Sequence, residues 1–321
     1  MKNTILVFTI SILAVTGCSY GENISIHDQK NNEKNVLDLY RQYSTYTDPG
    51  EYVYVYKDLP DSLQELCRLI RSQFMHPYAE LPKYRHLIPQ ERWNESFKYS
   101  TVRSILEGLL SHDSSGLVNN RKPEDRLILG CRDYAVLLAS ILKYRGIPAR
   151  VRYGHASYLN PGFHLSHTIC EVWNENDKRW MLVDPSMDMV DFNREKFDFS
   201  NDLWLKMQRD EIDPELYGNP GQYSGLVSIL GKVCHDLASI LGTEHTIYHY
   251  APILEYAFEN DSRLTDDHRA TLNRISELMR SIDAVNLSKL QEIYNSTPYI
   301  QVTRTFDPEK KAENKSNSAG I

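Results

Sequence analysis

The segment that decides the fold is GCRDYAVLLASILKYRGIPARV, residues 130–151. Its apolar residues have the spacing of a helix that is packed on most sides inside the protein, and Gly146 is a typical residue at which such a helix ends. After Pro148 the pattern changes to the alternation of a β-strand. The segment therefore predicts a buried helix that starts near Cys131 and leads directly into a strand.

Two more strands are expected downstream, because residues 168–173 and 179–183 show the same alternation. A polar loop, NEND at residues 174–177, separates them and has a length suited to a hairpin. With this loop, Trp173 pairs with Lys178 across the hairpin.

In this register His167 lies directly opposite Asp184 on one face of the sheet. The Cβ atoms of such a pair are about 4.5–5.5 Å apart. An imidazole and a carboxylate at that distance can hydrogen-bond, which fixes the tautomer of the ring and stabilises its protonated form.

Helices are expected on both sides of these strands in the sequence. The order is helices, then a helix that feeds a small antiparallel sheet, then helices, and this order predicts an α+β fold. The expected helices cover residues 63–74 and 99–110 before the sheet, and residues 226–241, 253–258, 266–282 and 287–294 after it.

Cys131 is the best candidate for a nucleophile because it starts the buried helix. Unpaired N–H groups and the helix dipole stabilise a thiolate at such a position, and a nearby imidazolium lowers the thiol pKa further. The same N–H groups can stabilise an oxyanion on an attacked carbonyl. The alternative for Cys131 is a packed structural thiol.

The other cysteines of the globular part are Cys67, Cys170 and Cys234. Each falls among apolar residues of an expected helix or strand, which favours packing in the core, and one disulfide among them stays open.

Four segments resemble the transglutaminase-like superfamily in their order and spacing. They correspond to its nucleophile helix with the following strand, its histidine strand and its aspartate strand. The resemblance covers about residues 95–190 and implies a papain-like core. The segments are GCRDYA at 130–135, GIPARV at 146–151, SHT at 166–168 continuing into EVW at 171–173, and WMLVDPS at 180–186.

The resemblance implies roles for three residues: Cys131 as nucleophile, His167 as base and acid, and Asp184 as the carboxylate that orients the ring. The chain departs from the family at Thr168-Ile169, where many relatives have Ala-Trp, and this leaves the shape of the acyl pocket open.

The family's second oxyanion donor normally comes from upstream of the cysteine. Asn119, Asn120 and the aromatic residues around Tyr99 are candidates, and the sequence does not choose among them.

These residues predict a thiol enzyme that acts on amide or peptide bonds of a peptide or protein substrate through an acyl-thioester. Hydrolysis, by a protease or amidase, ranks before transfer to an amine because hydrolysis needs no second substrate site. The alternative is a surface binding or assembly protein that keeps the fold and has lost turnover.

The N-terminus has the pattern of an export signal. Lys2 precedes an apolar stretch at residues 5–15, which is too short to span a bilayer. The following VTGC resembles the lipobox of bacterial lipoproteins, which implies cleavage before Cys18 and acylation of its thiol. Ser19 after the cysteine favours the outer membrane over the inner membrane of the cell envelope. The alternative is an ordinary secretory signal.

The chain therefore divides into five expected parts. They are a signal peptide (1–17), a polar tether (18–34), the transglutaminase-like domain with its N-terminal helices (35–200), a helical C-terminal region (201–306) and a disordered tail (307–321).

Composition excludes several function classes. The formal net charge of −7 and the lack of a basic run argue against nucleic-acid binding. A mean hydropathy of −0.49 excludes a protein with many membrane spans, and 41% hydrophobic residues exclude a wholly disordered chain.

No cofactor is expected. The sequence has no P-loop, GxGxxG, GxSxG or HExxH motif. His155, His164 and His167 with Asp184 would be a conceivable zinc set, but loop histidines are more often polar surface residues.

Overall fold

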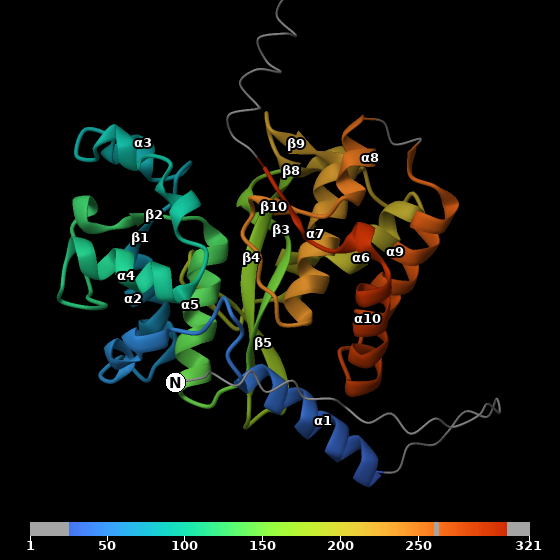
Figure 1. Ribbon diagram of the computed structural model, residues 1–321, viewed down its shortest axis with the longest axis horizontal. Helices are drawn as coiled ribbons and strands as arrows, with labels where there is room; N and C mark the ends of the chain where they lie inside the picture. Colours follow the sequence, from blue (N-terminus) through green and yellow to red (C-terminus); the bar gives the residue numbers. More distant parts are fainter. Residues whose placement is uncertain (1–25, 260–262, 307–321) are drawn as a thin grey trace, which may run out of the picture.

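The computed structural model describes residues 26–259 and 263–306. Helices and one central sheet alternate in the predicted order, so the α+β class is confirmed. Figure 1 shows the sheet as a middle layer with helices on both sides. The expected signal peptide, Cys18 and the tail at residues 307–321 lie outside the described residues.

The central sheet has the strand order β6-β5-β4-β3-β7 with antiparallel neighbours. β8 joins β4 in parallel, and β9 pairs with β8. The sheet is larger than predicted because strands of two or three residues are too short to show alternation. The strands are β3 Ala149–Asn160, β4 Phe163–Asn174, β5 Arg179–Asp184, β6 Met189–Val190, β7 Phe197–Phe199, β8 Tyr217–Asn219 and β9 Tyr223–Ser224.

Two hydrophobic cores hold the helices to this sheet. One includes side chains of α2, α4 and α5, and the other includes side chains of α1 and α6 to α10. The helices are α1 Ile26–Arg41, α2 Leu63–Gln73, α3 Leu81–Tyr84, α4 Val102–His112, α5 Cys131–Tyr144, α6 Ser200–Gln208, α7 Gly225–Ile240, α8 Ile253–Glu259, α9 Asp266–Leu278 and α10 Ala284–Ser296.

Two short strand pairs complete the fold. β1 Phe74–Met75 pairs in parallel with β2 Leu127–Ile128, just before α5. β10 His249–Tyr250 pairs with β11 Arg304–Thr305. Within the described residues, no helix has the length and apolar character needed to cross a membrane.

The predicted buried helix is α5, and its ends follow from local sequence. At the start, the Gly130 N–H donates to Asp133 Oδ2 at 3.1 Å, which caps the first turn. At the other end Gly146 has φ +70°, a conformation that glycine adopts without strain, and the chain then turns into β3.

The predicted hairpin register is wrong by one position on each strand. Asn174 pairs with Arg179, and the loop starts one residue later than predicted. Asn174 Oδ1 accepts hydrogen bonds from the backbone N–H groups of Asn176 and Asp177, so this side chain organises the turn from the end of β4.

The correct register sets Asp184 diagonally to His167 rather than directly opposite it. Because the two shifts together move the pairing by two residues, the side-chain alternation is unchanged. His167 and Asp184 therefore still share one face of the sheet, as predicted.

The expected polar tether is wrong from Ile26 onward, where α1 begins. Polar residues dominate the start of this helix, and the side chains that join the core come later, at Val36 and Tyr40. The polar pattern of the expected tether therefore did not indicate this helix, whose described core side chains are Val36 and Tyr40.

The C-terminal region is mostly helical, but it is not purely so. β8 and β9 come from it and extend the central sheet, and α7 packs against β3. The expected domain boundary at residue 200 stays a prediction, although the sheet is continuous across it.

Candidate active site

Three elements bring the predicted site residues together. Cys131 is the first residue of α5, His167 lies in β4, and Asp184 is the last residue of β5. His167 Nε2 and Asp184 Oδ2 are 2.7 Å apart, and both side chains are buried. Cys131 and His167 act on each other electrostatically, because the charge of His167 lowers the pKa of the thiol and the charge of Cys131 raises the pKa of the ring.

Asp184 is held by four hydrogen bonds besides the bond to His167. Its Oδ1 accepts from the Ser186 N–H at 2.9 Å, the Ser186 hydroxyl at 2.7 Å and the Met187 N–H at 3.2 Å. Its Oδ2 accepts from the Tyr158 hydroxyl at 2.6 Å. Burial acts to raise the pKa of this carboxyl, but the charge of His167 and these hydrogen bonds lower it by more. The net pKa of Asp184 is below its ordinary value, so the carboxylate stays ionised.

His167 is a buried ring that favours its protonated form. Burial acts to lower the pKa of His167, but the charges of Asp184 and Cys131 and the hydrogen bond to Asp184 raise it to about 10. The ring is therefore an imidazolium at neutral pH.

Cys131 differs from the other cysteines within the described residues. Its side chain is partly exposed, whereas Cys67, Cys170 and Cys234 are buried, and none of the four is in a disulfide. Burial acts to raise the pKa of Cys131, but His167 and then Lys232 lower it to below the ordinary value of a thiol. The His167 imidazolium thus favours the thiolate form of Cys131.

The remaining cysteines are structural. Burial raises the pKa of Cys67 and of Cys234 to about 12, and that of Cys170 well above its usual range. Cys170 Sγ donates to the Ala135 carbonyl at 3.0 Å, inside the α5 core. The expectation that these three thiols are packed in the core is confirmed, and they form no disulfide.

The start of α5 is anchored from the C-terminal part of the chain. Arg132 donates to the Glu244 carbonyl through Nε at 3.1 Å and also through Nη2. The same guanidinium pairs with Asp133 at 2.9 Å. These buried contacts fix the start of α5, where the N–H groups of a first helical turn lack intrahelical partners.

The candidates for a second oxyanion donor stay predictions, and the structure gives only their surroundings. Asn119 and Asn120 are exposed, and Asn120 takes a left-handed turn conformation. Tyr99 packs over Gly108 of α4, where a Cβ atom would collide with its ring.

The conceivable zinc set does not come together either. His155 Nε2 bonds Ser228 Oγ at 2.8 Å, and His164 Nδ1 bonds Asp198 Oδ2 at 2.6 Å. In the part of the chain that the structure describes, no three histidine, cysteine or acidic residues cluster as metal ligands.

The sequence did not identify two contributors to the site. Tyr158 binds Asp184, but the alternation predicted β3 only as far as Tyr153. Lys232 acts on Cys131 from α7, where a lysine has the same pattern as any polar position of a helix.

Comparison with known proteins agrees with this geometry. Residues 119–185 match the family model of the transglutaminase-like superfamily. This segment is a transglutaminase-like core. The matched range contains Cys131, His167 and Asp184, so the family inferred from the sequence is confirmed.

One solved structure, of a proposed cysteine protease from Cytophaga hutchinsonii, is similar to the chain with 13% identity and a TM-score of 0.31. The similarity covers 52% of this chain, which spans about half (51%) of the length of that structure. No curated protein matches the chain. The helices outside the transglutaminase-like core, including α7, lie beyond the matched family segment.

Proposed function

We propose that the chain is a cysteine hydrolase that cleaves amide or peptide bonds through an acyl-thioester on Cys131. His167 moves the proton, and Asp184 holds the imidazole ring and its charge. The substrate class is a peptide or protein, and transfer of the acyl group to an amine is the second outcome of the same chemistry.

The observation that carries this proposal is a thiol whose pKa is lowered by an imidazole that a buried carboxylate holds in place. The charge of His167 lowers the pKa of Cys131, and His167 Nε2 lies 2.7 Å from Asp184 Oδ2. A buried structural cysteine has a raised pKa, as Cys67, Cys170 and Cys234 do, whereas that of Cys131 is lowered. A lowered thiol pKa beside an oriented imidazole is the requirement for nucleophilic catalysis.

The proposed reaction has two steps. The Cys131 thiolate attacks the carbonyl carbon, the C–N bond of the tetrahedral intermediate breaks, and the His167 imidazolium gives its proton to the leaving nitrogen. The neutral imidazole then takes a proton from water, whose oxygen attacks the thioester carbon. The C–S bond breaks, the acid leaves, and the thiolate and imidazolium are restored.

We also propose that the enzyme is attached to the bacterial cell envelope through a lipid on Cys18, with the outer membrane favoured. This proposal rests on the lipobox-like VTGC and on the residue after it.

Alkylation tests the thiolate directly. We would treat the protein with iodoacetamide across pH and quantify each cysteine by mass spectrometry in the wild type, Cys131→Ala and His167→Ala. We expect Cys131 to react well below the pH at which an ordinary thiol ionises, and His167→Ala to move this reaction to higher pH. The buried Cys67, Cys170 and Cys234 serve as internal controls.

Turnover is tested on a peptide library with the same variants. We expect cleavage by the wild type, an acyl adduct on Cys131 detectable by mass spectrometry, and no cleavage by Cys131→Ala. If Cys131 alkylates like an ordinary thiol and independently of His167, the hydrolase is rejected and a binding protein is the better description.

A further inference from the structure

The Tyr158 side chain contacts both members of the buried His167–Asp184 pair. Its hydroxyl donates to Asp184 Oδ2 at 2.6 Å. The centroids of the Tyr158 and His167 rings are 6.0 Å apart, and the ring planes are at 89°, so the two rings meet edge to face. One tyrosine therefore lies against the imidazole and against the carboxylate that holds this imidazole.

The position of Tyr158 follows from an irregularity in β3. The pairing of β3 with β4 is regular up to Ala156, and the register shifts between Ala156 and Asn160. Such irregularities re-aim a side chain, and they are common beside active sites. The ring of Phe192 packs against Tyr158 with the centroids 5.7 Å apart. The irregular end of the strand and this aromatic neighbour together place the tyrosine at the site.

The hydrogen bonds from Tyr158 and His167 end on the same oxygen of Asp184. His167 Nε2 lies 2.7 Å from Oδ2, and the Tyr158 hydroxyl lies 2.6 Å from it. The other oxygen, Oδ1, accepts from Ser186 and Met187. A hydrogen bond to the ionised form of a carboxyl group stabilises that form, so the carboxylate becomes a weaker base. The Tyr158 hydroxyl therefore reduces the attraction of Asp184 for the proton of His167.

The Tyr158 hydroxyl is the donor in this contact. Burial and then the charge of Asp184 raise the pKa of Tyr158 far above its usual range, so the phenol keeps its proton. Asp184 is ionised and can only accept. The hydrogen bond from Tyr158 is also among the causes that lower the pKa of Asp184.

His167 has two opposed tasks in the proposed reaction. As an imidazolium it favours the thiolate, but it must then give its proton to the leaving nitrogen. A pKa of about 10 suits the first task and opposes the second, because a general acid works best when its pKa is near the working pH. A group that weakens the hold of Asp184 on this proton therefore assists the second task.

We propose that Tyr158 is a positioning residue of this enzyme, which orients the Asp184 carboxylate and weakens its hold on the His167 proton. The inference rests on the proposed function. Tyr158 acts through Asp184, and its effect falls on the step in which the C–N bond breaks. In that step the electron pair of the bond stays on the leaving nitrogen, and the proton passes from the imidazolium to this nitrogen.

The proton affinity of His167 is measured directly by NMR. We would label the histidine rings with ¹³C and follow His167 across pH in Cys131→Ala and in the double variant with Tyr158→Phe. Removal of the thiol uncouples the ring from Cys131, whose charge raises the pKa of His167. Phenylalanine keeps the ring and removes only the hydroxyl. We expect His167 to titrate about one pH unit higher with Tyr158→Phe.

Tyr56→Phe is the matched control for the titration. The Tyr56 hydroxyl also makes a buried hydrogen bond, to Ser140 Oγ of α5 at 2.8 Å, and Ser140 lies nine residues after Cys131. Its removal in the Cys131→Ala protein should leave the titration of His167 unchanged. A thermal unfolding transition verifies that each variant is folded.

Two substrates with the same acyl group separate proton donation from thiolate formation. We would prepare the best peptide of the library as its amide and as its p-nitrophenyl ester. The leaving nitrogen of the amide needs a proton, whereas p-nitrophenolate leaves without one. For Tyr158→Phe with Cys131 present, we expect kcat/KM to fall by about 3–10-fold on the amide and to stay close to wild type on the ester. The plateau rate of alkylation by iodoacetamide should also stay close to wild type.

An unchanged or lower titration of His167 in the Tyr158→Phe variant would overturn the proposed role. Equal losses on the amide, on the ester and in alkylation would overturn it as well, because they would show that the hydroxyl only keeps the site folded. Failure of the proposed function gives a different result: the wild type forms no acyl adduct at Cys131 with either substrate, while the titration of His167 still reports the effect of Tyr158.

Discussion

The hydrogen bond between His167 and Asp184 keeps a charged ring stable in a buried position. Burial alone lowers the pKa of a histidine, yet the pKa of His167 is raised to about 10, because a buried carboxylate and a thiolate flank the ring. Two groups that would be costly to bury separately therefore stabilise each other. This arrangement favours the thiolate form of Cys131.

The pH dependence follows from the sign of these shifts. The folded protein keeps His167 protonated up to a pH of about 10, whereas an unfolded histidine loses its proton near 6.5. The stabilisation that this pair provides is fully present below 6.5 and is lost as the pH rises through about 10. The Cys131 thiol has a lowered pKa in the folded protein. The stability that its thiolate contributes is therefore lost as the pH falls through this lowered pKa.

The variant Asp184→Asn tests the negative charge beside His167. The amide keeps the shape of the side chain but removes its charge, so the pKa of His167 should fall and the thiolate should be less populated. We expect kcat/KM on a peptide substrate to fall by about 10³–10⁴-fold, with the alkaline limb of the pH profile moved to lower pH.

Asp198→Asn is the matched control for this prediction. Asp198 also bonds a histidine, His164, at 2.6 Å, but this pair is partly exposed and does not contact Cys131. Its replacement should leave the pH profile unchanged. A wild-type profile in Asp184→Asn would show that the carboxylate is dispensable.

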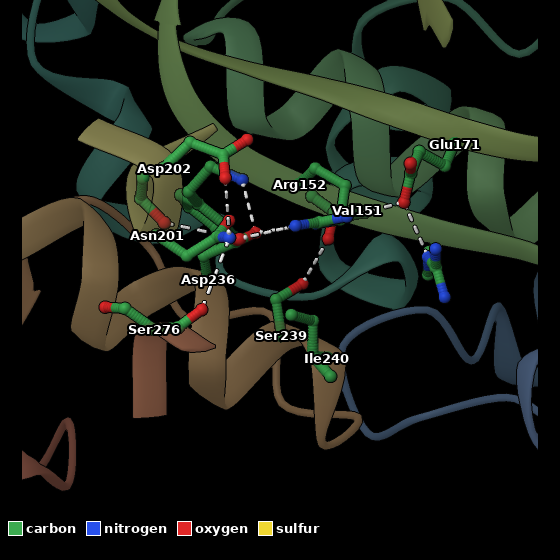
Figure 2. Close-up of polar contacts among 12 residues, drawn as sticks. Val151, Arg152, Glu171, Asn201, Asp202, Asp236, Ser239, Ile240 and Ser276 are labelled. Carbon is green, nitrogen blue, oxygen red and sulfur yellow. Dashed lines mark hydrogen bonds and ion pairs between the residues drawn. The ribbon is translucent and has the colours of Figure 1, made fainter. Parts of the chain in front are cut away.

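At the scale of elements, a chain of buried charges joins β4, β3 and α7. Glu171 Oε2 accepts from Arg150 Nε at 2.7 Å and from Arg152 Nη1 at 2.6 Å, and Arg152 continues to Asp236 of α7. Burial raises the pKa of Glu171, but the two guanidinium groups lower it to about 2. Figure 2 shows this chain, which connects the histidine strand to the helix that carries Lys232.

Removing one end of this chain should therefore destabilise the fold. Asp236→Ala leaves Arg152 with one fewer buried counter-charge and removes the acceptor of the Tyr153 N–H. We expect a loss of about 3–5 kcal/mol in the free energy of unfolding, measured by urea denaturation.

The control variant for Asp236→Ala is Asp191→Ala, which breaks an ion pair between Asp191 and Arg179 on the surface. Solvent screens this pair, so its loss should change the unfolding free energy far less. If the two variants lost similar amounts of unfolding free energy, the buried chain of charges would stabilise the fold no more than a surface ion pair does.

At the scale of the whole molecule, the active site lies where two helical layers meet at one sheet. Figure 1 shows α5, with Cys131 at its start, on one side and α7 on the other side of β3 and β4. The family segment at residues 119–185 supplies thiol, imidazole and carboxylate, and α7 adds Lys232. Regions outside the family core are thus part of the site's electrostatics.

The remaining prediction concerns where this molecule resides. If Cys18 carries a lipid, the wild type expressed in a Gram-negative host should sediment with membranes and incorporate radiolabelled palmitate. Cys18→Ser should lose the label and be recovered in the soluble fraction. A wild type that is exported, unlabelled and soluble would favour an ordinary secretory signal.

The sequence by itself determined which elements carry the three residues of the candidate site. The start of α5 at Cys131, the strand that follows it, and the shared face of His167 and Asp184 all depend on local periodicity. The prediction that His167 and Asp184 share a face was correct although the predicted register was wrong. The pairing differs by two residues, and side-chain alternation repeats every two residues.

Only the tertiary structure decided which distant residues meet that site. The addition of β8 to β4, the bond from Tyr158 to Asp184 and the contact of Lys232 with the Tyr153 ring depend on how separate segments dock. Periodicity indicates that a helix such as α7 has a buried face, but several docking arrangements bury the same apolar area. The polar contacts of Ser228 and Asp236 select one of them, and they form only in the assembled fold.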